Sequence, residues 1–167
     1  ELMMQMGCTD ALVTAAQQHP DSEDVQASTA GAMRNLAVSD DSKHSIAEGD
    51  GLEVLIEATK RHTSSALVQA QVASALRNLS LIDEIAEQIA GTGGIQALLT
   101  VSRAHPDNPK VLAGAAGALR NLTVNDEIAQ QIALAGAIEV LIKASGDHPD
   151  HAEVQAEAAG ALWGLST

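Results

Sequence analysis

Aromatic residues are almost absent from this sequence. It contains no Phe and no Tyr, and its one Trp is Trp163. A core for 167 residues must therefore be built from Ala, Leu, Ile and Val. Such side chains suit closely packed helices better than the two faces of a sheet sandwich.

The sequence also lacks a second cysteine and any long apolar run, so we expect neither an internal disulfide nor a membrane-spanning helix. Cys8 is the one cysteine, so no internal disulfide can form. No run approaches the ~20 apolar residues that cross a bilayer, and no signal-peptide pattern opens the chain.

Basic residues are scarce as well. Nine Lys and Arg stand against 22 Asp and Glu, which gives a net charge of −13. Binding to nucleic acid or to an anionic membrane relies on clustered cations, so we expect neither partner.

What the sequence does contain is a repeat. Arg-Asn-Leu begins at Arg34, Arg77 and Arg120, with a constant spacing of 43 residues. A fixed period in the forties indicates a helical solenoid. The chain 1–167 is then one domain, composed of a partial unit, 1–39, and three units, 40–82, 83–125 and 126–167.

Each unit is predicted to begin with a short helix. In the second full unit Asp83 is the predicted N-cap, and the helix ends near Ala90, before the glycines of "GTGG". The predicted N-caps of the other units are Asp40 and Asp126. The first residues of the chain align with the end of such a helix and with the helix that follows it.

Two more helices complete the unit. The second is predicted at 95–105, and the third at 109–123 with Asn108 as its N-cap. Both carry an apolar stripe of helical periodicity, and no β-alternation appears. The predicted fold class is all-α.

Third helices that end in "ALRNLS" or "ALWGLS" resemble those of the armadillo repeat, over essentially the whole chain. The match is closer to the β-catenin and plakophilin type than to importin-α. The resemblance implies a right-handed superhelical solenoid with three helices per repeat, whose third helices line a concave groove for peptides. It also implies an intracellular protein.

Asparagines on the third helices are the first candidate ligand-binding residues. Asn78 shares a helical stripe with Gln71 and Ser74, and in an armadillo protein this stripe faces the groove. A carboxamide can bond both the N–H and the C=O of a peptide backbone. The alternative is that the asparagines bond the neighbouring repeat. The full set is Asn35, Asn78 and Asn121.

The adjoining arginines, Arg34, Arg77 and Arg120, allow two interpretations. They form either a positive stripe that selects an acidic peptide, or each of them pairs with an acid of its own or the next repeat. Trp163 takes the place of arginine in the last unit. It either anchors a partner or caps the last core layer.

One departure from importin-α concerns the tryptophans that importin-type repeats carry one turn before the groove asparagine. This chain has small residues there, namely Gly31, Ser74, Gly117 and Gly160. We therefore do not expect recognition of a nuclear-localisation signal in the importin manner. The glycines instead widen the groove or admit another backbone.

Catalytic and metal-binding constellations are missing. His19, His62, His105 and His148 follow the period and so lie one repeat apart, too far to share a metal ion. We interpret them as structural, and we expect no cofactor and no enzymatic activity.

Apolar residues at both ends complete the prediction. Leu2, Met3, Met4 and Met6 open the chain, and Leu162, Trp163 and Leu165 close it, which predicts homo-association through uncapped ends. The first functional hypothesis is a non-enzymatic scaffold that binds a protein or peptide segment in the groove. The alternative is a self-assembling, structural or consensus-designed array without a groove ligand.

Overall fold

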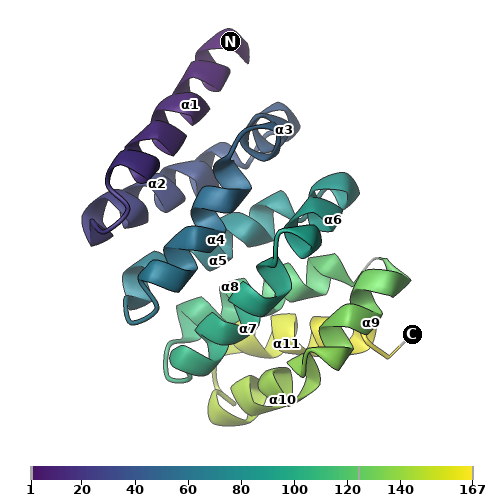
Figure 1. Cartoon of the computed structure of the whole chain (residues 1–167). Coiled ribbons are helices and arrows are strands. Elements are labelled where there is room, and N and C mark those ends of the chain that lie inside the picture. The colour runs from purple at the N-terminus through teal and green to yellow at the C-terminus, as the bar shows by residue number, and fades with distance from the viewer. Residues whose placement is uncertain (1, 124, 167) are drawn as a thin grey trace.

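The computed structural model describes the backbone of residues 2–123 and 125–166, and the side chains of residues 7–123 and 125–166. These residues form eleven helices and no strand, so the all-α prediction is confirmed (Figure 1). The helices are α1 (Leu2–Gln18), α2 (Glu23–Leu36), α3 (Asp40–Glu48), α4 (Gly51–Arg61), α5 (Ala66–Leu79), α6 (Asp83–Gly91), α7 (Gly94–Ala104), α8 (Pro109–Leu122), α9 (Asp126–Leu134), α10 (Ala137–Asp147) and α11 (Ala152–Gly164).

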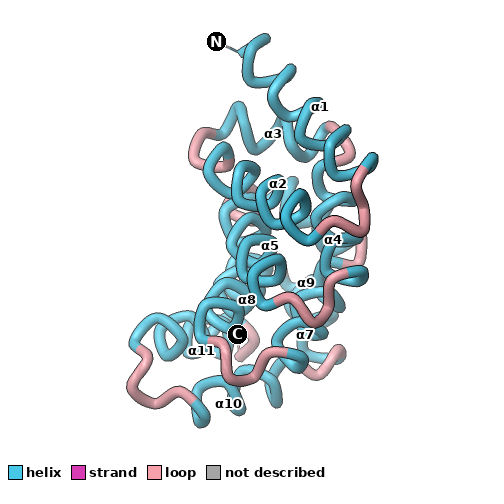
Figure 2. The backbone as a smooth tube through the Cα atoms, turned by 90° about the vertical axis from the view of Figure 1, so that its left-hand side faces the viewer, coloured by secondary structure: helices cyan, strands magenta, loops and turns pink. Residues whose placement is uncertain are grey.

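Helix lengths recur along the chain. Helices of 9, 11 and 14 residues follow one another as α3–α5 and again as α6–α8, and α9–α11 have 9, 11 and 13 residues. The last helix of each unit has 13 or 14 residues, and these helices, α2, α5, α8 and α11, pack side by side in one row, here called the long-helix row (Figure 2). The helices α4, α7 and α10 form a second row against it.

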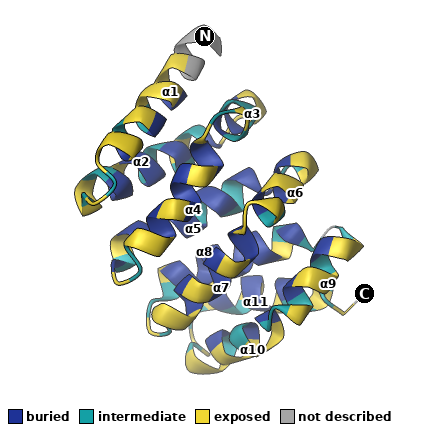
Figure 3. Ribbon diagram, viewed as in Figure 1, coloured by how far each residue is buried: buried dark blue, intermediate teal, exposed yellow. Residues whose placement is uncertain are grey.

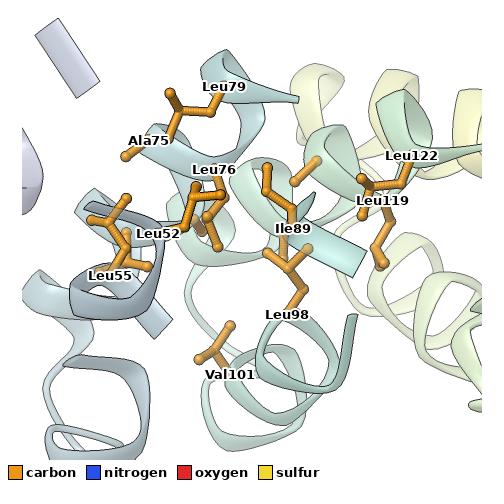
Figure 4. Close-up of a cluster of buried hydrophobic side chains, with 14 of the residues drawn as sticks. Leu52, Leu55, Ala75, Leu76, Leu79, Ile89, Leu98, Val101, Leu119 and Leu122 are labelled. Carbon is orange, nitrogen blue, oxygen red and sulfur yellow. The ribbon is translucent and has the colours of Figure 1, made fainter. Parts of the chain in front are cut away.

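The core lies where these rows meet (Figure 3). Its large side chains are aliphatic, and leucines such as Leu76 and Leu119 are at most 1% exposed (Figure 4). The apolar stripes predicted for the second and third helices are confirmed as core: Ile95, Leu98, Leu99, Val101, Val111, Ala115, Ala118, Leu119 and Leu122.

Membrane crossing finds little support in these helices. No single helix in the described part of the chain is long and apolar enough for it. The helices α9 and α10 meet the length and composition criteria only together, as a pair bent by 73°.

Glycines make the sharp turns between the first and second helices of two units. Gly93 and Gly136 have φ values of +88° and +84°, a region that side chains with a Cβ rarely adopt. Space is also tight at Gly94, where a Cβ would lie 2.6 Å from the carbonyl oxygen of Ile89, so a larger residue requires this turn to shift. The predicted glycine break is confirmed at these turns. At the corresponding turn before α4, Asp50 has an ordinary φ of −77°.

The predicted N-caps of the short helices are wrong by one residue. Asp40, Asp83 and Asp126 are the first helical residues, and the caps are the residues before them. The Ser39 hydroxyl accepts from the N–H of residue 42, and the Asn125 carboxamide accepts from two N–H groups. The helix dipole also favours a carboxylate in the first turn. An Asp at the start of a helix is therefore expected either as the N-cap or as the first helical residue. At Asp40, the hydrogen bond and charge of Lys43 lower the pKa of the carboxyl group.

The chain start also differs from the prediction. A single helix of 17 residues, α1, replaces the expected end of one helix and start of the next. Gly7 stands at the position of the turn glycines Gly93 and Gly136 but lies inside α1. A single glycine is tolerated within a helix at a cost of about 1 kcal/mol, so it does not by itself make a turn.

Periodic histidines join each unit to the one before it. The Nε2 atoms of His62, His105 and His148 lie 2.8, 2.7 and 2.6 Å from backbone carbonyl oxygens. These oxygens belong to the loop that precedes the long helix of the preceding unit, and since a carbonyl accepts, Nε2–H is the donor. Each of these histidines is the C-cap of its helix. The structural interpretation of this series is therefore confirmed for these three.

A periodic glutamine was missed. The side-chain N–H groups of Gln69 donate to the carbonyl oxygens of Thr59 and His62, which lack helical partners at the end of α4. Gln26 and Gln155 make the same pair of bonds in their own units. The signal that could have revealed them was the spacing of 43 residues from Gln26 to Gln69 and of two periods from Gln69 to Gln155, with Leu112 at the position between.

Candidate binding groove

Two adjoining recesses follow the exposed side of the long-helix row and share Arg77. Together they are called the groove. The first, of about 210 Å³, lies between α2, α5 and α8 and is lined by Arg34, Leu67, Ala70, Gln71, Ser74, Arg77, Lys110, Ala113, Gly114 and Glu153. The second, of about 320 Å³, is lined by Arg77, Asn78, Leu81, Arg120, Asn121 and Glu157.

Seven of the nine predicted site residues line the groove: Arg34, Gln71, Ser74, Arg77, Asn78, Arg120 and Asn121. The other two, Asn35 and Trp163, are exposed and line neither recess. These seven residues thus lie together around two adjoining recesses, and their role in binding stays a prediction.

The asparagines join neighbouring helices of the row. The Nδ2 atom of Asn78 donates to the backbone oxygen of Arg34 at 3.0 Å, and Asn121 does the same to Arg77. Asn121 also donates to the hydroxyl group of Ser80. The structural role that was weighed for these side chains is thus present. No hydrogen bond reaches either carboxamide oxygen from the described residues, so each remains available as an acceptor.

Two of the three arginines form internal ion pairs. Arg77 donates to the carboxylates of Glu153, at 2.9 Å, and Glu157. Arg120 donates to the other oxygen of Glu157 at 3.2 Å. The interpretation of a fully free positive stripe is therefore wrong for Arg77 and Arg120. Their pairing partners are acids of the last unit.

The Arg77–Glu157 pair spans two interhelical spacings. On a flat row α5 and α11 would lie about 16–20 Å apart, given 8–10 Å between neighbouring helices. Their side chains meet above α8, so the row bends toward this face. Neither glutamate was predicted as a site residue. The signal available was that Glu157 is the one acid on the stripe that also carries Gln71 and Gly114.

Glycines on the row provide the path for these arginines. A Cβ on Gly117 would lie 2.6 Å from Nε of Arg77, and a Cβ on Gly160 would lie 2.6 Å from Cδ of Arg120. A Cβ on Gly114 would approach the backbone of α5 at 3.2 Å. Gly114 was not among the glycines predicted to admit another backbone. Of those that were, Gly117 and Gly160 accommodate an arginine side chain, and a Cβ on Gly31 would contact the Gln71 side chain at 3.4 Å.

Arg34 differs from the other two arginines. The residue that corresponds to Gly117 for this arginine is Ser74, so a residue with a side chain stands where the other two arginines pass a glycine. Arg34 instead donates to the side-chain oxygen of Asn35, at 3.0 and 3.3 Å. No acid among the described residues pairs with Arg34 or with Lys110, which lines the same recess. The first recess therefore carries positive charge that is not neutralised.

The last unit exposes apolar side chains. Trp163 is 73% exposed, so the alternative that it caps the last core layer is wrong. Ile138 and Ile142 are 40% and 58% exposed, whereas Ile95 and Leu99, one period earlier, are 5% and 0% exposed. The side chains of residues 2–6, including the predicted methionine cluster, lie outside the described residues.

Comparison with known proteins bears on the fold. No protein-family model matches the chain, and no curated protein sequence matches it significantly. A crystal structure of an engineered protein superimposes with a TM-score of 0.83 and 29% sequence identity. The match covers 96% of this chain and 63% of that protein. This chain therefore has an all-helical arrangement found in an engineered protein and spans less than two thirds of its length.

Proposed function

We propose that this chain is an armadillo-type solenoid of three-helix repeats that binds a peptide segment along the groove without catalysing a reaction. The 43-residue period, the recurring helix lengths and the packed row of long helices support the repeat type. The engineered neighbour supports the arrangement of helices and carries no argument about a ligand.

The observation that carries the binding role is the regular supply of polar groups in the groove. Asn78 and Asn121 present unpaired carboxamide oxygens from equivalent positions on adjacent helices. Helices 8–10 Å apart correspond to about two to three residues of an extended chain at ~3.3–3.6 Å each. A bound segment can therefore donate a backbone N–H to successive asparagines at a constant interval.

An apolar contact is available beside these acceptors. Leu81 is 62% exposed and lines the second recess together with Arg77 and Asn78. Its counterpart one period earlier, Val38, is 79% exposed and lines neither recess. The two positions form a matched pair, because both are exposed and only one belongs to the groove.

Selection of peptides from a displayed random library on the unmodified chain, followed by affinity measurements on variants, tests the proposal. We expect Leu81→Asp to weaken the selected peptides about tenfold, because a buried contact would be replaced by a charge that must be desolvated. Val38→Asp should leave their affinity unchanged. Equal affinities for both variants, or no selected peptide at all, would show that the groove is not a peptide site.

A second candidate function, self-assembly, is favoured by the exposed face of the last unit. Ile138, Ile142 and Trp163 expose apolar surface in this unit. One unit earlier, the residues that correspond to the two isoleucines, Ile95 and Leu99, are buried. If this face pairs between copies, light scattering after size exclusion should show a mass that rises with concentration. Ile142→Glu should return the protein to the monomer mass. A monomer at millimolar concentration would rule the assembly out.

A further inference from the structure

We propose that the first recess binds a side-chain carboxylate of an acidic peptide segment, held by Arg34 and Lys110 with Arg77 beside them. This inference rests on the proposed function and specifies the ligand chemistry of that groove. It follows from comparing two positions of the groove that are related by the repeat.

The second recess shows how this surface already binds a carboxylate of the chain itself. Glu157 is 6% exposed, and its two carboxylate oxygens receive hydrogen bonds from Arg77 and Arg120, which belong to adjacent long helices. Glu153 adds a further bond to Arg77. Charge-assisted bonds of this kind are among the strongest that side chains form. Here, arginines of two successive units hold one carboxylate.

One period earlier the same positions carry different residues. Gly114 stands at the position of Glu157, and Lys110 stands at the position of Glu153. The chain therefore supplies no carboxylate at this place, and a lysine takes the position of an acid. Both residues line the first recess with Arg34 and Arg77. Three cations consequently face one recess in which Glu153, already bound to Arg77, is the sole acid of the lining.

Other groups in the first recess fit an incoming peptide. Gln71 lines the recess, and its Oε1 atom, buried beside Gly31, has no hydrogen-bond partner among the described residues. Rotation of this side chain toward the recess would allow Oε1 to accept a backbone N–H. Leu67, which is 53% exposed, supplies an apolar wall together with Ala70 and Ala113. The recess thus suits an acidic residue followed by a small or aliphatic one. The net charge of −13 works against such a ligand at long range, so recognition must come from these local contacts.

The test uses a fluorescein-labelled peptide of eight residues that alternates glutamate and alanine, and a second peptide with glutamine in place of glutamate. Fluorescence anisotropy at low salt should show binding of the first peptide and not of the second. Arg34→Gln should weaken binding at least tenfold. Lys110→Glu should weaken it more, because the new acid repeats the arrangement of Glu153 and neutralises Arg34 or Arg77.

The matched control is Lys60→Glu, which makes the same change of net charge at an exposed site on α4. The affinity of Lys60→Glu for the glutamate–alanine peptide should fall only slightly. The helicity measured by circular dichroism should be the same in all variants. If Lys110→Glu and Lys60→Glu weaken binding of the acidic peptide equally, the effect comes from the net charge of the protein and the proposal is overturned. Equal binding of the two peptides, or no binding of the acidic one to the unmodified chain, would also overturn it. Groove-dependent peptides without acidic residues would then leave the proposed function standing.

Discussion

Replacing Leu119 by alanine should lower the free energy of unfolding by about 3 kcal/mol, within the range of buried leucine truncations. Leu119 lies on α8 in the middle of the long-helix row and is 1% exposed. It lies beside Leu122 and belongs to a core cluster whose members come from several helices, so the surrounding side chains cannot all move into the space left behind (Figure 4). Urea denaturation followed by circular dichroism measures the change.

The control is the same residue one unit further on. Leu162 occupies the position of Leu119 in α11 but is only half-buried, because no further long helix follows it among the described residues. Leu162→Ala should therefore cost about 1 kcal/mol, close to the transfer term for a partly exposed side chain. Equal losses of unfolding free energy at both positions would contradict the difference in burial between Leu119 and Leu162.

Most of the fold could be predicted because its determinants are local and repeated. The stripe of Val111, Ala115 and Leu119 on α8 identifies a buried face from helical periodicity alone, and the 43-residue period transfers that assignment to every unit. The helix starts were less certain. Asp83 suits the N-cap and the first turn equally well, and the structure places it in the first turn after Ile82.

The groove was predictable in its residues and not in its contacts. Periodicity places Asn78, Arg77 and Arg120 on one stripe without reference to distant residues. Whether an arginine is free depends on which acid the bend of the row brings near, and the partner of Arg77 is 80 residues away. The burial of Glu157 likewise depends on Gly117, which leaves the space through which Arg77 passes. Such pairings follow from the curvature of the row, which no local pattern encodes.

Replacing Gly94 by valine should destabilise the protein by about 3 kcal/mol, the upper part of the range for overpacked sites. The first atom of the new side chain would overlap Cγ2 of Ile89 and lie 2.6 Å from its carbonyl oxygen, and Ile89 is fully buried. The last unit carries Ala137 at this position, so a turn of this kind can accommodate one methyl group. Valine adds two more methyl groups at the branch point next to α6, and the turn must open to receive them.

Gly91→Ala, only three residues earlier, is the control for Gly94→Val. Gly91 ends α6, and a Cβ there would meet nothing within 4 Å. Alanine reduces the conformational freedom of the unfolded chain, so this variant should be as stable as the unmodified protein or more stable by up to ~1 kcal/mol. Thermal unfolding of the two variants should shift in opposite directions. A melting temperature for Gly94→Val equal to that of the unmodified protein would mean that the contact between this turn and Ile89 is not close in solution.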